Sequence, residues 1–451
     1  HPDQSGFMPL RSTMLNLRRL HGVLAQAHKL DTDTVVVSLD ARKAFDMVEW
    51  EYLWAVLDRM GFGPQFIRWI QLLYAEPQAR VKVNGAVSRA FTLHRGTRQG
   101  CPLSPVLFAM ALEPLAAWVR SDPLLSGIPG PGGWVDIISL YADDILLYLT
   151  KPNSSLDRIF HILRIFGRYS GYMINWDKSL IYPIAGSPPK IPPDIKIKVA
   201  VEGFKYLGIF ITNTQDKFMK NNLLPARDRL KNDIKHWTTL PLSLLGRAAL
   251  FKMMALPRLL YILQNTPYYV PKSFFAAINT EIRSLLWGVG RVRIAFQKLT
   301  KSWYAGGIAL PNIQHYYWAA QLTVINKWAH AQADEPALRM DRELTEPKGF
   351  LHALYSGWRE IERDTPTGQT LRIWRDANKA MGWNKRITLN TPLWALQEMQ
   401  TLREQVNCDK WERIGIDRVG DMWTEEGVKE WEELQEEFQL FRTERFKYLQ
   451  I

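Results

Sequence analysis

Cysteine is scarce in this sequence, with only Cys101 and Cys408 among 451 residues. Two cysteines exclude a disulfide-stapled scaffold and any zinc finger or knuckle built on cysteine ligands. A long uninterrupted apolar run is also lacking, because the most apolar helical stretch, residues 242–263, contains two arginines, a lysine and a proline. Such a stretch is typical of a buried helix, so we expect no membrane association.

An initiating methionine and a secretory signal peptide are missing as well, since the chain opens with His1. We therefore expect an N-terminally truncated piece of a longer product.

The basic residues are unevenly distributed. The chain has 57 lysines and arginines against 45 aspartates and glutamates, a net charge of +12. Residues 331–451 hold 18 basic and 23 acidic side chains, so the other 39 basic and 22 acidic side chains give residues 1–330 a net charge of +17. This excess favours a polyanionic partner such as nucleic acid, although a solvated basic surface without a partner has the same composition.

Hydropathy patterns predict a mixed α/β chain. Residues 35–40 (VVVSLD) are typical of a buried central strand, and residues 137–149 form an apolar hairpin interrupted only by Asp143 and Asp144. Asn84 and Gly85 predict a second hairpin within residues 80–93, and residues 203–212 form a further strand or hairpin. We expect helices around residues 15–24, 49–60, 65–74, 106–119, 156–169, 223–240, 242–263 and 273–286, a loop at 183–193, and a charged helix at 424–448.

The two carboxylates inside the apolar hairpin need an explanation, because adjacent like charges repel and burial of an unpaired carboxylate is costly. Asp40 ends another buried strand, so all three carboxylates meet if both strands belong to one sheet. Oxygen ligands without histidine or cysteine suit Mg²⁺ or Mn²⁺ rather than zinc. Two such ions about 4 Å apart support phosphoryl transfer. The alternative is ordinary turn chemistry, because aspartate tolerates turn dihedrals.

Five ordered segments resemble the motifs of reverse transcriptases. Residues 141–144 (YADD) are similar to the YxDD box of that family. The others are residues 39–46 (LDARKAFD, the first catalytic motif), 96–105 (GTRQGCPLSP, the glycine-rich motif), 174–179 (INWDKS, the motif after the box) and 204–209 (FKYLGI, the primer-grip motif). Flanking segments, residues 4–7 with 11–13 and residues 286–288 with 306–312, resemble those of non-LTR, LINE-type retrotransposon polymerases.

The resemblance implies a right-hand polymerase of the α/β (α+β) class, with an antiparallel palm sheet, partial fingers and an all-helical thumb. It also implies an RNA-directed DNA polymerase that extends a DNA 3′-hydroxyl on an RNA template with dNTPs, using two Mg²⁺ ions, with Mn²⁺ as a substitute. Nuclear localisation is expected from the life cycle of such elements. LINE-type proteins commonly carry a nuclease domain and many have a Cys/His knuckle, neither of which is recognised here, and no protein partner is predicted.

By the same resemblance, Asp40 and Asp143 ligate the metal ions and Asp144 supports the site. The backbone amides of Ala41 and Arg42 are expected to face the triphosphate. Phe45 is expected to pack under the sugar and to exclude a 2′-hydroxyl, its alternative being a core aromatic.

The remaining site residues come from the other three motifs. Gln99 and Gly100 are expected beside the incoming nucleotide and the template base. Lys178 either donates a proton to pyrophosphate or is an ordinary surface lysine. Leu207 and Gly208 are expected to form the turn that presses on the primer.

A basic run with an apolar face predicts a thumb helix that faces phosphates, and a solvated face is the alternative for each single side chain. Its basic members are Lys217, Lys220, Arg227, Arg229, Lys231 and Lys235.

We predict four regions. Residues 1–34 are a remnant of the fingers with a helix leading into the palm, residues 35–215 are the palm with finger elements, and residues 216–330 are the helical thumb with the connection after it. Residues 331–451 are an acidic region of unknown role that holds seven of the 18 tryptophans. Two alternatives to an active polymerase are a catalytically silent remnant that only binds nucleic acid and a scaffold that uses the tryptophan-rich region.

Overall fold

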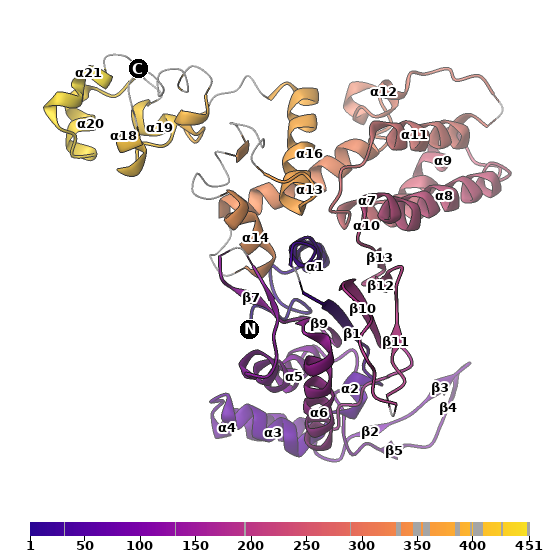
Figure 1. Cartoon of the computed structure of the whole chain (residues 1–451). Coiled ribbons are helices and arrows are strands. Elements are labelled where there is room, and N and C mark those ends of the chain that lie inside the picture. Colours follow the sequence, from indigo (N-terminus) through magenta and orange to yellow (C-terminus); the bar gives the residue numbers. More distant parts are fainter. Residues whose placement is uncertain are drawn as a thin grey trace. The chain divides into compact units, whose positions relative to one another are not determined.

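The computed structural model describes residues 1–30, 32–130, 132–193, 195–288, 290–330, 335–345, 353–354, 361–383, 388–396, 399, 409–424 and 427–448. The chain forms two compact units, His1–Phe218 and Met219–Ile451 (Figure 1). Cysteine 408 lies outside the described residues. The division into four regions stays a prediction.

The first unit is built on a five-stranded sheet in the order β11-β10-β1-β9-β8. Neighbouring strands are antiparallel, except that β10 and β11 are parallel. The strands are β1 (Thr34–Leu39), β8 (Ile138–Tyr141), β9 (Asp144–Thr150), β10 (Leu180–Ala185) and β11 (Lys198–Val199). The predicted α/β class with an antiparallel sheet and the two apolar segments predicted as strands are confirmed.

The central position of β1 explains its unbroken apolar sequence. Val35, Val36 and Val37 are all fully buried, because β9 and β10 flank the strand and other elements cover both faces of the sheet. Burial of each such side chain contributes about 1.5–3 kcal/mol to folding. The same burial fixes the end of the strand, so Asp40 emerges at a defined edge of the sheet.

Helices cover the two faces of the sheet, with α1 on one side and α5 and α6 on the other, and α3 packs against α5 and α6 (Figure 1). Alternating residues such as Val37 and Leu39 of β1 pack into one apolar core with Leu112 and Ile159 from the second group. The helices of the unit are α1 (Thr13–Ala27), α2 (Ala44–Met47), α3 (Trp50–Arg59), α4 (Pro64–Leu73), α5 (Ser104–Ser121), α6 (Pro152–Ser170) and α7 (Gln215–Phe218).

Four short strand pairs complete the first unit: β2 (Gln78–Ala79) with β5 (Phe91–Thr92), β3 (Lys82–Val83) with β4 (Ala86–Val87), β6 (Ile128–Pro129) with β7 (Val135–Asp136), and β12 (Phe204–Tyr206) with β13 (Ile209–Ile211). Asn84 and Gly85 connect β3 to β4 with positive φ angles, as expected for a two-residue hairpin turn. The hairpins predicted at residues 80–93 and 203–212 are therefore confirmed.

The loop predicted for residues 183–193 is partly wrong, because β10 continues through Pro183 to Ala185. In the described part of the sheet, β11 pairs only with Leu180 and Ile181 of β10. Pro183 pairs with Val35 on the opposite side. A proline is tolerated there, since its missing N–H removes no ladder bond on the unpaired side of the strand.

The second unit is helical in its described residues and has its own apolar core, which includes Ile234, Phe251 and Ile282. Its first helices are α8 (Leu224–Trp237), α9 (Leu244–Leu250), α10 (Leu256–Gln264) and α11 (Lys272–Trp287). Two π-helical turns that the sequence did not predict, η1 (Met219–Leu223) and η2 (Phe251–Ala255), precede α8 and α10. Both helices have proline as their second residue, and a wide turn relieves the clash of the proline ring with the carbonyl four residues earlier.

The rest of the second unit consists of shorter pieces: α12 (Phe296–Leu299), η3 (Trp303–Ala305), α13 (Ile313–His330), α14 (Pro336–Thr345), α16 (Pro366–Met381), η5 (Leu393–Ala395), α18 (Asp409–Arg413), α19 (Val419–Met422), α20 (Trp431–Glu437), η6 (Arg442–Glu444) and α21 (Arg445–Tyr448). None of the described helices combines the length and the apolarity needed to cross a lipid bilayer.

The single charged helix predicted at residues 424–448 is wrong. The described residues from 427 onward form α20, η6 and α21, with Gln439 at a left-handed φ of 53° between the first two. Trp394, Trp411 and Trp431 are buried in a small local core, so packing of apolar side chains outweighs the helical propensity of the glutamates.

Candidate active site

The register of the central strands brings two of the three predicted carboxylates together. Leu39 pairs with Ile145 across β1 and β9. Asp40 follows Leu39 and Asp144 precedes Ile145, so the antiparallel register places these two aspartates opposite each other at one edge of the sheet. Asp143 lies next to them in the two-residue turn that joins β8 to β9, because Tyr141 pairs with Asp144.

This turn, residues 142–143, contains a residue in the left-handed conformation that is not glycine. Ala142 has a φ of 56° and is buried. Such a conformation costs a residue with a Cβ about 1–2 kcal/mol, so contacts from outside the hairpin must hold it.

Electrostatic interaction among the carboxylates is visible in Asp144. Its pKa is raised to about 6, first by burial and then by the negative charges of Asp143 and Asp40. A raised pKa is the expected response of a carboxylate that shares a half-buried site with others of its kind. The charges of Asp143 and Asp40 therefore act on Asp144.

Tyr172, in the segment that follows α6, also contacts the site. The hydroxyl of Tyr172 donates a hydrogen bond of 3.4 Å to the carbonyl oxygen of Asp143. Burial, followed by the charges of Asp143, Asp144 and Asp40, raises the pKa of Tyr172, so its hydroxyl stays protonated. Tyr172 is not among the residues predicted from the sequence. The only signal for it in the sequence is the presence of an aromatic residue just before the motif at residues 174–179.

The segment predicted as the motif after the box, residues 174–179, is tied directly to Asp40. The amide of Asp40 donates to the hydroxyl of Ser179 at 3.1 Å, and its carbonyl accepts from the amide of Asn175 at 2.8 Å. Lys178 belongs to this segment and is exposed. The segment thus lies beside Asp40.

One expectation about the nucleotide site needs correction. The amide of Arg42 donates to the carbonyl of Met173 at 2.8 Å, as part of a bridge between Ala41 and Ile174. That amide is therefore already bonded and does not face a triphosphate. Arg42 is an exposed residue, so its guanidinium remains accessible to an anion such as a phosphate.

Phe45 is half-buried in an aromatic cluster. Its ring stacks on Phe108 at a centroid distance of 4.4 Å and meets the edge of Phe7 at 6.2 Å. Its carbonyl accepts a hydrogen bond of 2.6 Å from the amide of Thr97. The ring is therefore fixed in place while part of it stays accessible, which suits both a core aromatic and a residue that contacts a sugar.

The glycine-rich motif docks on the same region through Gly96, whose amide donates to Val48 at 2.8 Å. A Cβ on Gly96 would lie 2.7 Å from the carbonyl oxygen of Asp46, so only glycine fits there. Gln99 and Gly100 follow, and both are exposed. A Cβ on Gly100 would meet no atom within 4 Å, so this glycine borders open space.

The predicted primer-grip residues form the turn between β12 and β13. Leu207 and Gly208 have φ angles of 45° and 79°, and Tyr206 pairs with Ile209 to close the hairpin. The hydroxyl of Tyr206 donates to the side-chain oxygen of Asn16 at 3.1 Å. The Asn16 amide nitrogen in turn donates to Ser139 and to the carbonyl of Leu140 on β8, at 3.1 and 3.3 Å. One buried asparagine of α1 therefore connects the hairpin to the strand that precedes the YADD turn.

The basic helix of the second unit has the amphipathic form that was predicted. Leu230, Ile234 and Trp237 of α8 are buried, whereas Arg229 and Lys235 are exposed. Exposure permits phosphate contact but is equally typical of a solvated face.

Among the described residues, no group of three or more histidine, cysteine, aspartate or glutamate side chains is arranged to hold a metal ion. Asp40 and Asp144 lie opposite each other at one edge of the sheet, and Asp143 lies in the adjoining turn.

Comparison with known proteins identifies what the first unit is similar to. Residues 1–211 match the family model described as reverse transcriptase (RNA-dependent DNA polymerase). The chain is 28% identical over 315 residues to the transposon TX1 uncharacterized 149 kDa protein of Xenopus laevis, covering 68% of this chain and 23% of that protein. It is also 28% identical over 278 residues to a Pol polyprotein from a type-1 retrotransposable element R2 of Popillia japonica, covering 59% and 38%.

A third relative is the Pol polyprotein of the type-2 element R2DM from Drosophila melanogaster, which is 25% identical over 358 residues and is covered to 32% of its length. The chain thus spans between about a quarter and two fifths of these relatives. Among solved structures, telomerase from Candida albicans in complex with a fragment of telomeric RNA matches 82% of this chain and 55% of that chain, at 12% identity and a TM-score of 0.37. Residues 1–211 thus match a reverse transcriptase domain, and the relatives named for the TX1 transposon and the R2 elements support a reverse transcriptase of the non-LTR retrotransposon type.

Proposed function

We propose that this chain extends a DNA 3′-hydroxyl on an RNA template by adding dNTPs. The observation that carries the proposal is the meeting of Asp40 and Asp144 across β1 and β9, with Asp143 in the adjoining turn and the pKa of Asp144 raised to about 6. Carboxylates that repel one another at an accessible sheet edge are the arrangement that nucleotidyl transfer requires.

The donor set fits Mg²⁺ or Mn²⁺, because Asp40, Asp143 and Asp144 offer hard oxygen ligands and the mutual repulsion seen in Asp144 is what a cation would offset. When bound, two such ions supply activation of the primer hydroxyl and stabilisation of the leaving pyrophosphate. We assign Asp40 and Asp143 as the principal ligands and Asp144 as the supporting one.

The nucleotide is proposed to lie beside the first catalytic motif. The Arg42 guanidinium and the Lys178 ammonium, both on exposed residues next to Asp40 in the fold, are the cations for its phosphates. Phe45, held between Phe7 and Phe108, is the ring proposed to contact the sugar and to reject a 2′-hydroxyl. Gln99 and Gly100 are proposed to face the incoming base, Gly100 because a neighbour can approach its backbone.

The primer is proposed to be held by Leu207 and Gly208, at the tip of a hairpin that Asn16 ties to β8. Lys217 and the basic residues of η1 and α8 are proposed to contact the phosphates of the template–primer duplex without reading its sequence. Chromosomal DNA is the natural source of such a primer, so we propose a nuclear site of action.

The second candidate is a silent remnant that binds nucleic acid through its basic surface and performs no chemistry. The net charge of +17 on residues 1–330 is the observation that favours it, since this charge supports binding whether or not the carboxylates are used. A scaffold based on residues 331–451 would show itself if their deletion abolished a protein interaction while nucleic-acid affinity stayed intact.

Primer extension separates the first two candidates. The wild-type chain is given an RNA template, a DNA primer, dNTPs and Mg²⁺, and is compared with Asp143→Asn and with Asp58→Asn, an exposed carboxylate on α3 that serves as the matched control. We expect incorporation by the wild type and the control, and a loss of at least about 10³-fold in Asp143→Asn. Equal incorporation by Asp143→Asn would reject the assigned site, and tight template–primer binding without incorporation by any chain would support the remnant.

A further inference from the structure

A segment near the start of the chain runs alongside the catalytic hairpin. The amide of Ser5 donates to the carbonyl of Leu140 at 2.8 Å, and the amide of Leu140 donates to the carbonyl of Asp3 at 2.9 Å. Gln4 thereby forms a parallel bridge with Leu140, at the outer edge of β8. This segment, residues 3–6, extends the sheet next to the YADD turn.

The side chain of Gln4 reaches from this segment to the turn itself. Its Oε1 accepts hydrogen bonds from the amides of Ala142 at 3.0 Å and Gly6 at 2.8 Å. Its Nε2 donates to the carbonyl of Ala142 at 3.3 Å. Both backbone polar groups of the left-handed Ala142 are therefore bonded by one side chain that is only 3% exposed.

The segment approaches the turn so closely that position 6 must be glycine. A Cβ on Gly6 would lie 2.1 Å from the backbone nitrogen of Ala142 and 2.8 Å from its Cα. The two backbones therefore touch, and the segment leaves the turn no room to move towards it.

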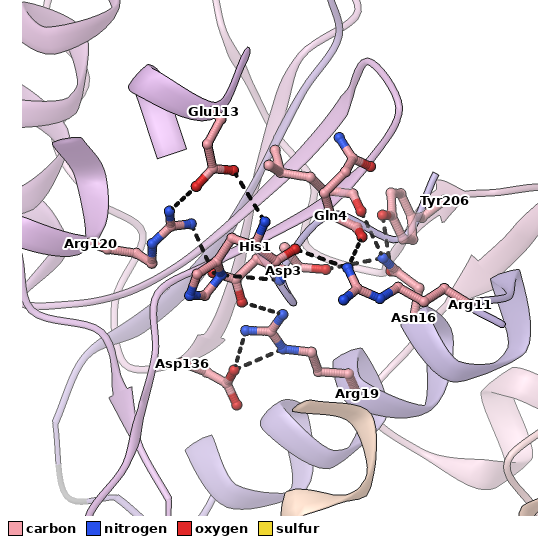
Figure 2. Close-up of polar contacts among 12 residues, drawn as sticks. His1, Asp3, Gln4, Arg11, Asn16, Arg19, Glu113, Arg120, Asp136 and Tyr206 are labelled. Carbon is pink, nitrogen blue, oxygen red and sulfur yellow. Dashed lines mark hydrogen bonds and ion pairs between the residues drawn. The ribbon is translucent and has the colours of Figure 1, made fainter. Parts of the chain in front are cut away.

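Buried ion pairs anchor the segment at its other end (Figure 2). The Asp3 carboxylate accepts from Arg19 of α1 at 2.8 Å and from Arg120 of α5 at 3.0 Å. Arg19 also contacts Asp136 of β7, at 2.8 Å from its Nε. Arg11 donates to the backbone carbonyl of Gln4 at 2.5 Å. Side chains from α1 and α5, together with Arg11, therefore fix the segment that carries Gln4.

We propose that Gln4 is a positioning residue for nucleotidyl transfer: it holds the turn of Ala142 and Asp143 so that the carboxylates of Asp143 and Asp144 stay in register with Asp40. This inference rests on the proposed function. Its physical basis is the steep dependence of rate on geometry, since a displacement of about 1 Å at a reacting group can cost about 10²-fold in rate. Gln4 itself touches backbone and not the reacting atoms.

The test compares two substitutions that keep the volume of the side chain. Gln4→Met removes all three hydrogen bonds, whereas Gln4→Glu keeps an oxygen that accepts from Ala142 and Gly6 and replaces the donor to the Ala142 carbonyl with a second oxygen. Gln71→Met, at an exposed glutamine of α4, is the matched control. Each chain is assayed for single-nucleotide incorporation, for template–primer affinity and for thermal unfolding.

Amide hydrogen exchange gives a readout that does not depend on activity. In Gln4→Met we expect faster exchange at residues 141–144 with unchanged exchange in β1, a kcat at least 10-fold lower, and unchanged template–primer affinity. Gln4→Glu is expected to lie between Gln4→Met and the wild type in both exchange and kcat. The control is expected to match the wild type.

Unchanged kcat in Gln4→Met despite faster exchange would overturn the proposal, as would a kcat of Gln4→Glu no higher than that of Gln4→Met. A variant that unfolds globally shows loss of protection in β1 as well, and then Gln4→Glu decides. If the wild type incorporates no nucleotide, the polymerase proposal fails, while the exchange measurement still decides whether Gln4 holds the turn.

Discussion

Two tight turns of the first unit solve the same geometrical problem in different ways. The turn of Leu207 and Gly208 has two successive residues at positive φ, and the second of them is glycine, which adopts this conformation at little cost. The turn of Ala142 and Asp143 contains no glycine and places a residue with a Cβ at a φ of 56°. Its own sequence does not favour this conformation, and the turn is instead hydrogen-bonded by Gln4, which is 138 residues away in the sequence.

The difference shows how a turn without glycine is held. Position 142 has a left-handed φ and carries alanine, and hydrogen bonds from a distant segment satisfy both of its backbone polar groups. A turn that only presents backbone is free to use glycine and to fold from local information.

The largest expected effect comes from breaking the external support of the catalytic turn. Gly6→Ala places a Cβ 2.1 Å from the backbone of Ala142, and neither backbone can yield without disturbing the sheet edge. We expect a loss of about 3 kcal/mol in the free energy of unfolding together with loss of incorporation. Urea unfolding followed by tryptophan fluorescence measures the first quantity.

Gly63→Ala is the control for that substitution, because Gly63 has a φ of −63° and a Cβ there would meet no atom within 4 Å. A Gly6→Ala chain as stable as Gly63→Ala would contradict the close backbone approach.

A smaller loss is expected in the turn that relies on local sequence. Gly208→Ala forces a residue with a Cβ to a φ of 79°, which costs about 1–2 kcal/mol. Because no carboxylate belongs to this turn, the loss should be the same at pH 5 and pH 7.5. Thermal unfolding at the two pH values checks this, and a loss that changes with pH would show that the two turns are not independent in their electrostatics.

The smallest expected effect has the opposite sign. The pKa of Asp144 is about 6 in the folded chain and close to 3.8 when unfolded, so the folded state binds the proton more tightly. The free energy of unfolding therefore falls as the pH rises from about 4 to about 6 and stays low above that range. Asp144→Asn removes this cost, and we expect it to stabilise the chain by about 1 kcal/mol at pH 7.5, after allowance for solvent screening.

The measurement for Asp144→Asn is thermal unfolding in EDTA at pH 4.5 and pH 7.5. Stabilisation is expected only at the higher pH, and an equal gain at both would assign the effect to packing rather than to charge.

Local patterns were enough to predict much of the first unit. The apolar run ending in Asp40, the interrupted run around Asp143 and the Asn84–Gly85 turn each carry their signal within a few residues, and all three elements are present. The meeting of Asp40 with the Asp143–Asp144 turn at one edge of the sheet follows from the pairing of β1 with β9, which the sequence allowed but did not determine.

The features that could not be predicted depend on distant partners. Pro183 is tolerated in β10 because of where β11 stops, and the charged segment near the C-terminus is divided because Trp431 and its neighbours pack into a local core. The contacts of Gln4 and Asn16 join residues more than 100 positions apart. Short-range periodicity contains no information about such bonds.

The bond between Asn16 and Tyr206 has a consequence for protein engineering. A single amide of α1 connects the hairpin that is proposed to hold the primer with the strand that leads into the carboxylates. A chimera that takes its hairpin from one relative and its sheet from another must therefore also include a matching α1. Otherwise the growing strand and the carboxylates will not be aligned with each other.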